Sequence, residues 1–195
     1  MKMYLGINDE NFLRDKKTPM TKREIRILTL VLARVYEAEI IVDIGAGTGS
    51  ISIEAAKFVP DGNIFAIERN LDAVEILKKN IEKFSADNVT VINGEASEAL
   101  KNFSALDVAI IGGSGGKLED ILNIVDEKLK VGGRIAANFI AIQNLSICLQ
   151  WFKRHKNYHY EAMQVQINHL NQVGVYDMAK AANPIFIVVG TKDQG

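Results

Sequence analysis

Short apolar runs of strand length alternate with segments of helical periodicity along most of this chain, and no other feature limits its possible folds as strongly. The runs are Ile40–Ile44, Asn63–Ile67, Val89–Ile92, Asp107–Ile111 and Arg134–Ile140, and the helical patterns lie at about 50–58, 70–84, 97–103, 117–129 and 143–156. This alternation is typical of βαβ units, and strands that helices cover on both faces have near-continuous apolar sequences. The sequence therefore predicts an α/β protein with a mostly parallel sheet.

The pattern changes on both sides of this region. Two strand-like stretches, at about 160–170 and 185–191, are separated by Asn171–Asn183. Because doubly wound sheets often carry an antiparallel edge, we expect a C-terminal hairpin that completes a seven-stranded sheet. Before the first strand, Thr21 and Glu24 have the spacing of a capping box, in which each side chain caps a backbone N–H at the start of a helix. The apolar side chains expected to face the sheet from this helix are Ile25, Leu28, Leu32 and Val35.

A glycine turn, Gly-Ala-Gly-Thr-Gly at 45–49, joins the first strand to the next helix. Gly45 allows a tight turn with positive φ, and Gly47 lets a ligand approach the backbone because no Cβ intervenes. Gly49 would let the following helix pack closely. The second strand ends on Glu68, where a carboxylate can accept hydrogen bonds from both hydroxyls of a ribose. The region therefore predicts a site for a cofactor that contains a nucleoside.

The spacing of the glycines and one acidic residue indicate which cofactor. Dinucleotide folds favour G-x-G-x-x-G, where the helix N-terminus receives a pyrophosphate. Here the pattern is G-x-G-x-G and Asp43 precedes it, which resembles motif I of the methyltransferases. An acid suits the cationic sulfonium and ammonium groups of S-adenosylmethionine and would repel a pyrophosphate. S-adenosylmethionine is the expected cofactor, with NAD and a purely structural turn as alternatives.

Two further loops follow strands three and four. Gly94 and Ala96 are small enough to leave room for a flat adenine ring, although an ordinary strand-to-helix turn would explain them equally well. The fourth strand leads into Gly112–Gly116, whose backbone N–H groups could form an anion-binding nest beside the cofactor; the alternative is a flexible loop. The substrate-loop candidates are Gly112, Gly113, Ser114, Gly115 and Gly116. Amino methyltransferases carry Asn/Asp-Pro-Pro-aromatic at this place, and this chain does not. Asn183-Pro184 looks similar but is interpreted as the start of the last strand.

Length, charge and cysteine content bound the protein class. The chain has 195 residues and suits a single domain, 1–195, with a lead-in and helix at 1–38, a cofactor-binding core at 39–156 and a hairpin at 157–195. Its net charge of −1 argues against a nucleic-acid partner, and no apolar run approaches the roughly 18 residues of a membrane span. The single cysteine, Cys148, is expected in the core and suits a cytoplasmic location. No Cys/His cluster has the spacing of metal ligands, so no metal is expected.

Several motifs that occur together in order resemble one family. They are Thr18-Pro-Met-Thr21-Lys-x-Glu24-Ile-Arg26, the Asp43–Ser50 glycine loop, Ala66-Ile-Glu68-Arg69-Asn70, Ile111-Gly-Gly-Ser-Gly-Gly116, Val131-Gly-Gly-Arg134 and Asn183-Pro184. The chain thereby resembles the CbiT family, the decarboxylating precorrin methyltransferases of cobalamin (vitamin B12) synthesis, across about residues 6–191. The glycine loop is common to many methyltransferases, whereas the lead-in together with Gly-Gly-Ser-Gly-Gly is specific. The stretch 157–183 matches least.

The resemblance implies a fold, a reaction and an assembly. The fold would be the Rossmann-like class I methyltransferase fold, with an antiparallel C-terminal hairpin on a mostly parallel seven-stranded sheet. The reaction would methylate C-15 of cobalt-precorrin-6B, a tetrapyrrole, and remove CO₂ from the ring C acetate to give cobalt-precorrin-7. A homotetramer is implied as well. With the residues considered above, the expected cofactor contacts are Thr21, Asp43, Gly45, Ala46, Gly47, Thr48, Gly49, Glu68 and Ala96.

Other functions and roles stay open at this point. A methyltransferase acting on tRNA adenine shares the fold, and a non-catalytic S-adenosylmethionine-binding module would need the same glycine loop. No catalytic residue and no proton donor for the decarboxylation can be named, and the three histidines, His155, His159 and His169, are expected at the surface or an interface. Candidate cations for the substrate's carboxylates are Arg14, Lys16, Lys17, Lys22, Arg23 and Lys117, most of them expected to be solvated surface charges.

Overall fold

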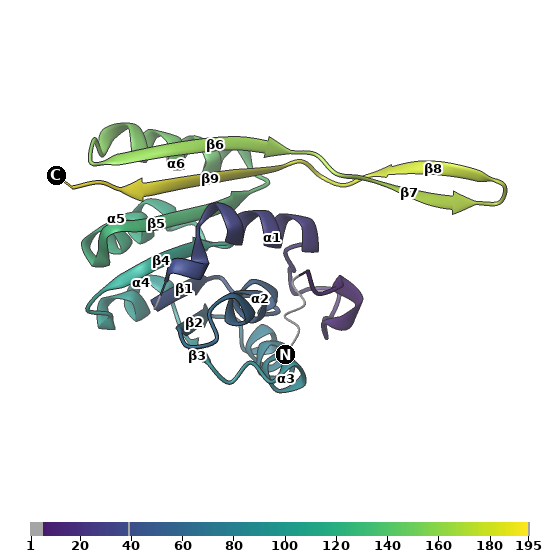
Figure 1. Cartoon of the computed structure of the whole chain (residues 1–195), viewed down its shortest axis with the longest axis horizontal. Helices are drawn as coiled ribbons and strands as arrows, with labels where there is room; N and C mark the ends of the chain where they lie inside the picture. Colours follow the sequence, from purple (N-terminus) through teal and green to yellow (C-terminus); the bar gives the residue numbers. More distant parts are fainter. Residues whose placement is uncertain (1–5, 39, 195) are drawn as a thin grey trace.

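The computed structural model describes residues 6–38 and 40–194 and contains one large, mostly parallel sheet (Figure 1). Its strands are β1 (Ile40–Ile44), β2 (Asn63–Glu68), β3 (Val89–Asn93), β4 (Leu106–Ile111), β5 (Leu129–Phe139), β6 (Tyr158–Val165) and β9 (Ile185–Lys192). They lie in the order β3-β2-β1-β4-β5-β9-β6. The first five run parallel, β9 is antiparallel to β5, and β6 is antiparallel to β9. The predicted α/β fold with a seven-stranded sheet is confirmed.

Helices cover both faces of the sheet. The α-helices are α1 (Arg23–Leu32), α2 (Ser50–Phe58), α3 (Leu71–Phe84), α4 (Ala96–Ala99), α5 (Leu118–Lys128) and α6 (Ile142–Arg154), and single 3₁₀ turns lie at Asp9–Asn11, Val35–Glu37 and Leu100–Asn102. Side chains of α1, α2 and α3 pack in one buried cluster, and those of α4, α5 and α6 pack in a second. Alternate residues of the strands enter the two clusters, as the double burial of parallel strands requires. Cys148 is buried in the second cluster, as predicted.

The start of α1 differs from the prediction. Lys22 is the N-cap residue and no side chain caps the helix, so the capping box of Thr21 and Glu24 is wrong. The reason is that Glu24 accepts a hydrogen bond from the guanidinium of Arg23 instead. The buried face of the helix also differs, because Leu28 and Leu32 are only partly buried. The buried residues of α1 are Ile25, Arg26, Thr29 and Leu30.

The C-terminal third contains a projecting arm. Residues expected to connect two strands instead form most of a separate two-stranded sheet, β7 (Asn168–Val173) with β8 (Tyr176–Ala181), and Figure 1 shows this arm extending beyond the ends of β6 and β9. The predicted hairpin is therefore correct for β6 and β9, but its connection is not a simple loop. Strand β5 begins at Leu129 rather than Arg134, because the two glycines at 132–133 obscure the strand pattern there. The predicted start of the core, at residue 39, lies outside the described residues.

Candidate functional site

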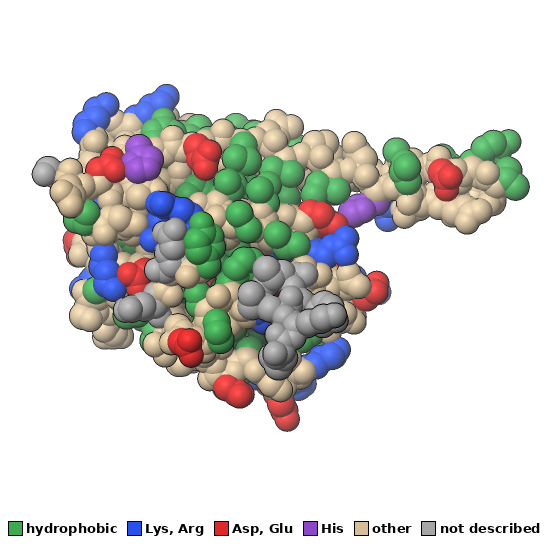
Figure 2. All heavy atoms as spheres, viewed as in Figure 1, with side chains coloured by type: hydrophobic (Ala, Val, Ile, Leu, Met, Phe, Trp, Pro, Cys, Tyr) green, Lys and Arg blue, Asp and Glu red, His purple; other side chains and the backbone are tan. Residues whose placement is uncertain are grey.

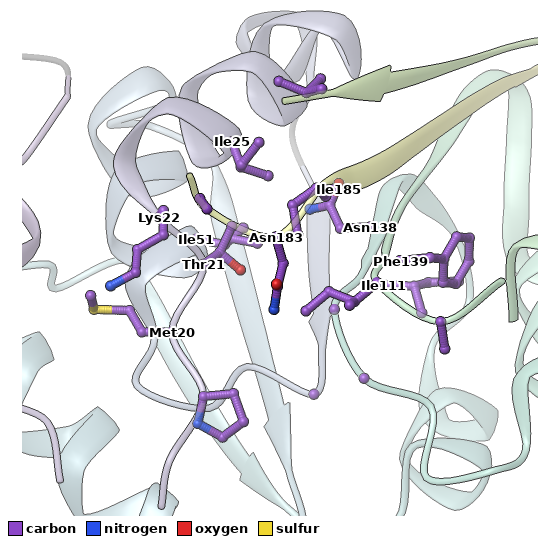
Figure 3. A pocket seen from close by; sticks show the side chains of 18 of the residues that line it. Met20, Thr21, Lys22, Ile25, Ile51, Ile111, Asn138, Phe139, Asn183 and Ile185 are labelled. Atoms are coloured by element: carbon purple, nitrogen blue, oxygen red, sulfur yellow. The ribbon is translucent and has the colours of Figure 1, made fainter. Parts of the chain in front are cut away.

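Two cavities meet at the carboxyl ends of the parallel strands, where open α/β sheets bind their ligands. One has a volume of about 320 Å³ and lies beside β2 and β3. The other, about 570 Å³, lies between α1, the end of β5 and the segments that connect β6 and β9 to the arm (Figure 3). Residues that line both cavities are Pro19, Gly45, Gly112, Gly113 and Ser114. The glycine loop and the Gly112–Gly116 loop thus form the boundary between two connected spaces.

The smaller cavity gathers four of the residues expected to bind the cofactor, Gly45, Gly47, Glu68 and Ala96. The Glu68 carboxylate accepts hydrogen bonds from the backbone N–H of Gly47 at 3.0 Å and of Asn70 at 2.8 Å. It therefore also orders the glycine loop. In the loop after β3, a Cβ built on Gly94 would meet no atom within 4 Å, so the space expected for a flat ring is open.

Two glycines of the loop are required by close backbone contacts. Gly45 has φ +73°, and a Cβ there would lie 2.7–2.8 Å from backbone atoms of Gly113. At Gly47 a Cβ would lie 2.7 Å from the carbonyl oxygen of Pro19, so the lead-in segment fills the side where a Cβ would point, while Gly47 still lines the smaller cavity. Thr48 is fully buried, and Gly49 precedes α2 and packs against α3. Thr48 and Gly49 therefore line neither cavity, whereas Ala46 lines the larger one.

Asp43 lies in β1 beneath the glycine loop and contributes to the wall of the larger cavity. Its side chain is 1% exposed, and its carboxylate accepts a hydrogen bond from the Ser52 hydroxyl at 2.5 Å. Burial raises the pKa of Asp43 to about 6, and the Ser52 hydrogen bond opposes that shift only in part. The carboxyl group is thus available as a counter-charge for a cation at the loop, at some expense in stability when it is ionised.

A buried ion pair holds the lead-in segment over this site. Arg26 is fully buried, its Nε lies 3.3 Å from the carboxylate of Glu54, and its Nη1 donates to the Thr21 carbonyl at 2.7 Å and to Asp9 at 3.0 Å. Earlier in the lead-in, the side-chain amide of Asn80 accepts a hydrogen bond from the backbone N–H of Leu13 and donates one to its carbonyl. The segment between these anchors carries Pro19 and Thr21 across the glycine loop. The sequence signal for this role is a charged residue, Arg26, on the apolar face of a helix.

The glycine-rich loop after β4 differs from the predicted anion nest. The N–H groups of Gly112 and Gly113 both donate to the carbonyl of Ile44, at 3.0 and 3.2 Å, so the prediction of free N–H groups is wrong for these two residues. Their hydrogen bonds join this loop to the end of β1. Glu95 accepts hydrogen bonds from Arg69 and Lys117, whose side chains lower its pKa. Of the six cations considered, Lys22 lines the larger cavity and Lys117 the smaller one.

Comparison with known proteins identifies the family. The precorrin methyltransferase domain family matches residues 10–192. The chain belongs to this family. It is 43% identical over 189 residues to a Sulfurisphaera tokodaii protein named "Probable cobalt-precorrin-6B C(15)-methyltransferase (decarboxylating)", covering 96% of this chain and 97% of the relative. It is 34% identical over 188 residues to the Salmonella typhimurium cobalt-precorrin-6B C(15)-methyltransferase (decarboxylating), with the same coverage. A crystal structure of precorrin-6y C5,15-methyltransferase from Geobacter metallireducens superposes with a TM-score of 0.91 at 37% identity, covering 96% and 98% of the two chains.

Several lining residues of this precorrin methyltransferase family member were not predicted. Asn183, interpreted from the sequence as a strand start, reaches into the larger cavity (Figure 3), because β9 lies beside β5 and begins at the same edge as the parallel strands end. Asn138 and Asn144 line the cavity from β5 and α6, and His169 lines it from the base of the arm. Their common signal is polarity next to an apolar run, which is too frequent in sequences to single them out. Among residues 6–38 and 40–194, no His, Cys, Asp and Glu side chains cluster as a metal site would require.

Proposed function

We propose that this protein transfers a methyl group from S-adenosylmethionine to C-15 of cobalt-precorrin-6B and removes CO₂ from the ring C acetate of the same tetrapyrrole. The observation that carries the proposal is the pair of cavities that share the Gly45–Gly113 boundary. A methyl donor in one and an acceptor in the other would meet there. The full-length similarity to proteins named for this reaction supports the choice of substrate.

The residues of the smaller cavity suit the donor. The Glu68 carboxylate can accept from ribose hydroxyls, and Gly94 and Ala96 leave space for adenine. The methionine portion would then extend along Gly45 and Ala46 toward Thr21 and the larger cavity. When bound, S-adenosylmethionine supplies an electrophilic methyl group on a sulfonium. The chain's own contribution is to hold the two reactants in line and to exclude water.

Removal of the Glu68 carboxylate should weaken donor binding. We expect Glu68→Ala to reduce the affinity for S-adenosylmethionine by about 1.5–3 kcal/mol, the usual contribution of hydrogen bonds to a charged group. Isothermal titration calorimetry measures this directly. Glu75→Ala on the exposed side of α3 is the control and should leave the affinity unchanged. Equal affinities of the Glu68→Ala and wild-type proteins would place the ribose elsewhere.

The reaction itself is tested by mass spectrometry of cobalt-precorrin-6B incubated with the protein and S-adenosylmethionine. The expected product has gained a methyl group and lost CO₂. Methyl transfer to bulk tRNA with none to the tetrapyrrole would favour the tRNA methyltransferase alternative. Tight donor binding without turnover of any tetrapyrrole would favour a non-catalytic binding module.

A side chain at the boundary should interfere with turnover. A Cβ on Gly113 would meet only the Cα of Gly45, at 3.7 Å, so the fold can accept it. The methyl groups of Gly113→Val would, however, stand where donor and acceptor meet. We expect kcat/KM for the tetrapyrrole to fall at least tenfold, about 1.4 kcal/mol in the transition state, while donor affinity changes less. Ala162→Val on the exposed side of β6 is the control; a folded Gly113→Val enzyme with normal kcat/KM would remove the loop from the substrate site.

The arm suggests how copies of the chain assemble, and we propose the homotetramer that the family resemblance implies. Isolated two-stranded hairpins are marginally stable, and this one exposes large apolar side chains, with Leu170 72%, Val175 86% and Tyr176 72% exposed. Figure 2 shows hydrophobic side chains gathered at its far end. A contact with other copies of the chain would cover them.

Light scattering on purified protein tests this assembly. The wild-type protein is expected at the mass of four chains, and the double variant Val175→Lys/Tyr176→Lys at a lower mass, because two charges would enter the interface. Leu71→Lys, at a side chain that is 67% exposed on α3, is the matched control and should keep the wild-type mass. A monomeric wild-type protein would contradict the proposal.

We also propose a cytoplasmic location, which the single buried cysteine suits. Among the helices of the described residues, none has the length and apolar sequence that a membrane span requires.

A further inference from the structure

The larger cavity has a wall whose chemistry differs from that of a carboxylate-binding surface. Apolar side chains from four parts of the fold form it, among them Ile25 of α1, Phe139 of β5, Ile167 beyond β6 and Ile185 of β9. The polar side chains on this side are neutral amides, of which Asn183 points into the middle of the cavity (Figure 3). A substrate group placed here would lose its water without meeting a cation at the wall.

Four ionisable side chains also line the cavity, and three of them have partners of their own. Lys22 pairs with Asp9 at 3.5 Å, and Glu24 pairs with Arg23 at 3.1 Å. Asp43 is buried beneath the glycine loop and bonded to Ser52. His169 stands on the arm, where its side chain is exposed to solvent.

One amide of the wall has a hydrogen-bonding group to spare. The Thr29 hydroxyl lies 2.7 Å from the carbonyl of Ile25 and 3.0 Å from Oδ1 of Asn138, while Nδ2 of Asn138 is buried and finds no partner within the described residues. The Thr29 hydroxyl contacts only one of the two polar atoms of the amide. Turning the amide would exchange its O and N at this contact, and the atom at the other position would still have no partner. In either orientation one buried polar atom of Asn138, a residue that lines the cavity, has no partner within the described residues, and leaving such an atom unpaired costs free energy.

We propose that this wall, with Asn138 and Asn183, is the subsite that receives the ring C acetate and from which its CO₂ departs. This inference rests on the proposed function. Ring C adjoins C-15, so a tetrapyrrole that presents C-15 to the donor at the Gly45–Gly113 boundary brings the acetate into the same cavity. Amides can orient the carboxylate by hydrogen bonds without the strong stabilisation that a cation would give it.

The chemistry explains why such a wall helps. The bond between the acetate methylene and the carboxylate carbon breaks, its electron pair stays on the methylene carbon and delocalises into the conjugated macrocycle, and CO₂ leaves. A proton from water then adds to that carbon to give a methyl group. The carboxylate loses its charge on the way to the transition state, so a cation would stabilise the reactant more than the transition state. An apolar wall that excludes water instead destabilises the charged reactant more than the transition state, and this lowers the barrier.

The test measures CO₂ released per methyl group transferred, using the full-length protein with cobalt-precorrin-6B and S-adenosylmethionine. Asn183→Lys replaces an amide that points into the cavity with a cation that can reach the acetate, and the residue is exposed in the protein alone, so the fold can accept the lysine. We expect the ratio to fall at least tenfold and a methylated product that keeps its carboxylate to accumulate. Asn138→Leu, which removes the orienting amide at similar volume, should lower the ratio in the same direction. Asn102→Lys, at an exposed residue outside the arm that lines neither cavity, is the matched control.

The outcomes separate this inference from the function on which it rests. If the wild-type protein methylates no tetrapyrrole, the proposed function fails. If the wild-type protein performs both reactions and Asn183→Lys keeps the wild-type ratio, the acetate lies elsewhere and the inference is overturned. A parallel loss of both reactions in a folded Asn183→Lys protein that still binds the donor would also overturn it, because Asn183 would then serve general substrate binding.

Discussion

We expect Arg26→Met to lower the free energy of unfolding by about 3–5 kcal/mol, the cost of leaving one member of a buried ion pair alone. Arg26 and Glu54 are both fully buried and lie 3.3 Å apart. Glu54 also accepts hydrogen bonds from the backbone N–H groups of Gly6 and Ile7. The substitution removes its cationic partner and frees the Thr21 carbonyl. Urea denaturation measures the change, and donor affinity should fall as well, because the lead-in is no longer anchored over the glycine loop.

Two comparisons identify the cause. Lys101→Met breaks an exposed pair with Glu98, whose side chains are 58% and 71% exposed, and should cost less than about 1 kcal/mol. In the double variant Arg26→Met/Glu54→Leu no unpaired charge is left, so much of the lost stability should return. If the double variant is as unstable as the losses of Arg26→Met and Glu54→Leu, each measured alone, added together, then packing and the unpaired backbone groups, rather than the buried charge, are responsible.

Asp43→Asn should stabilise the protein more at high pH than at low pH. In the folded protein burial raises the pKa of Asp43 to about 6, against an ordinary value of 3.8. A raised carboxyl pKa means that the folded state favours the protonated form, so stability is lost as the pH rises from 3.8 through 6. The asparagine variant does not ionise and should gain about 3 kcal/mol on the wild-type protein between pH 3 and pH 8, since each unit of pKa shift corresponds to about 1.36 kcal/mol.

Denaturation of both proteins across this pH range measures the difference. Asp87→Asn, at an exposed residue before β3, is the control, and its stability relative to the wild-type protein should not change with pH in this way. A constant difference between the Asp43→Asn and wild-type proteins would mean that the Asp43 carboxyl titrates normally. We further expect weaker donor binding by Asp43→Asn, because a neutral amide offers no counter-charge to a sulfonium.

The position of Asn183 in the cavity could not be predicted from the local sequence pattern. Its distance along the chain from β4 argued for a structural role, yet β9 inserts between β5 and β6 and brings Asn183 to the edge where the parallel strands end. The capping box at Thr21 and Glu24 failed for a more local reason. Its residues have the right spacing, but Arg26 binds the Thr21 carbonyl and Arg23 binds the Glu24 side chain. The pairing of distant strands decided the position of Asn183, whereas side-chain hydrogen bonds within one segment replaced the capping box.

The sequence by itself determined the order of strands and helices, the glycine loop, Glu68 and the family, because these depend on short-range periodicity and on motifs read along one segment. Tertiary structure alone decided what fills the space beside Gly47, which N–H groups of the Gly112–Gly116 loop are already bonded, and which amides line the larger cavity. It also decided that residues 168–181 form an arm. The arm is a local hairpin, but the other features join residues far apart in the chain, and a backbone hydrogen bond or a steric contact between such residues leaves no periodic trace in either segment.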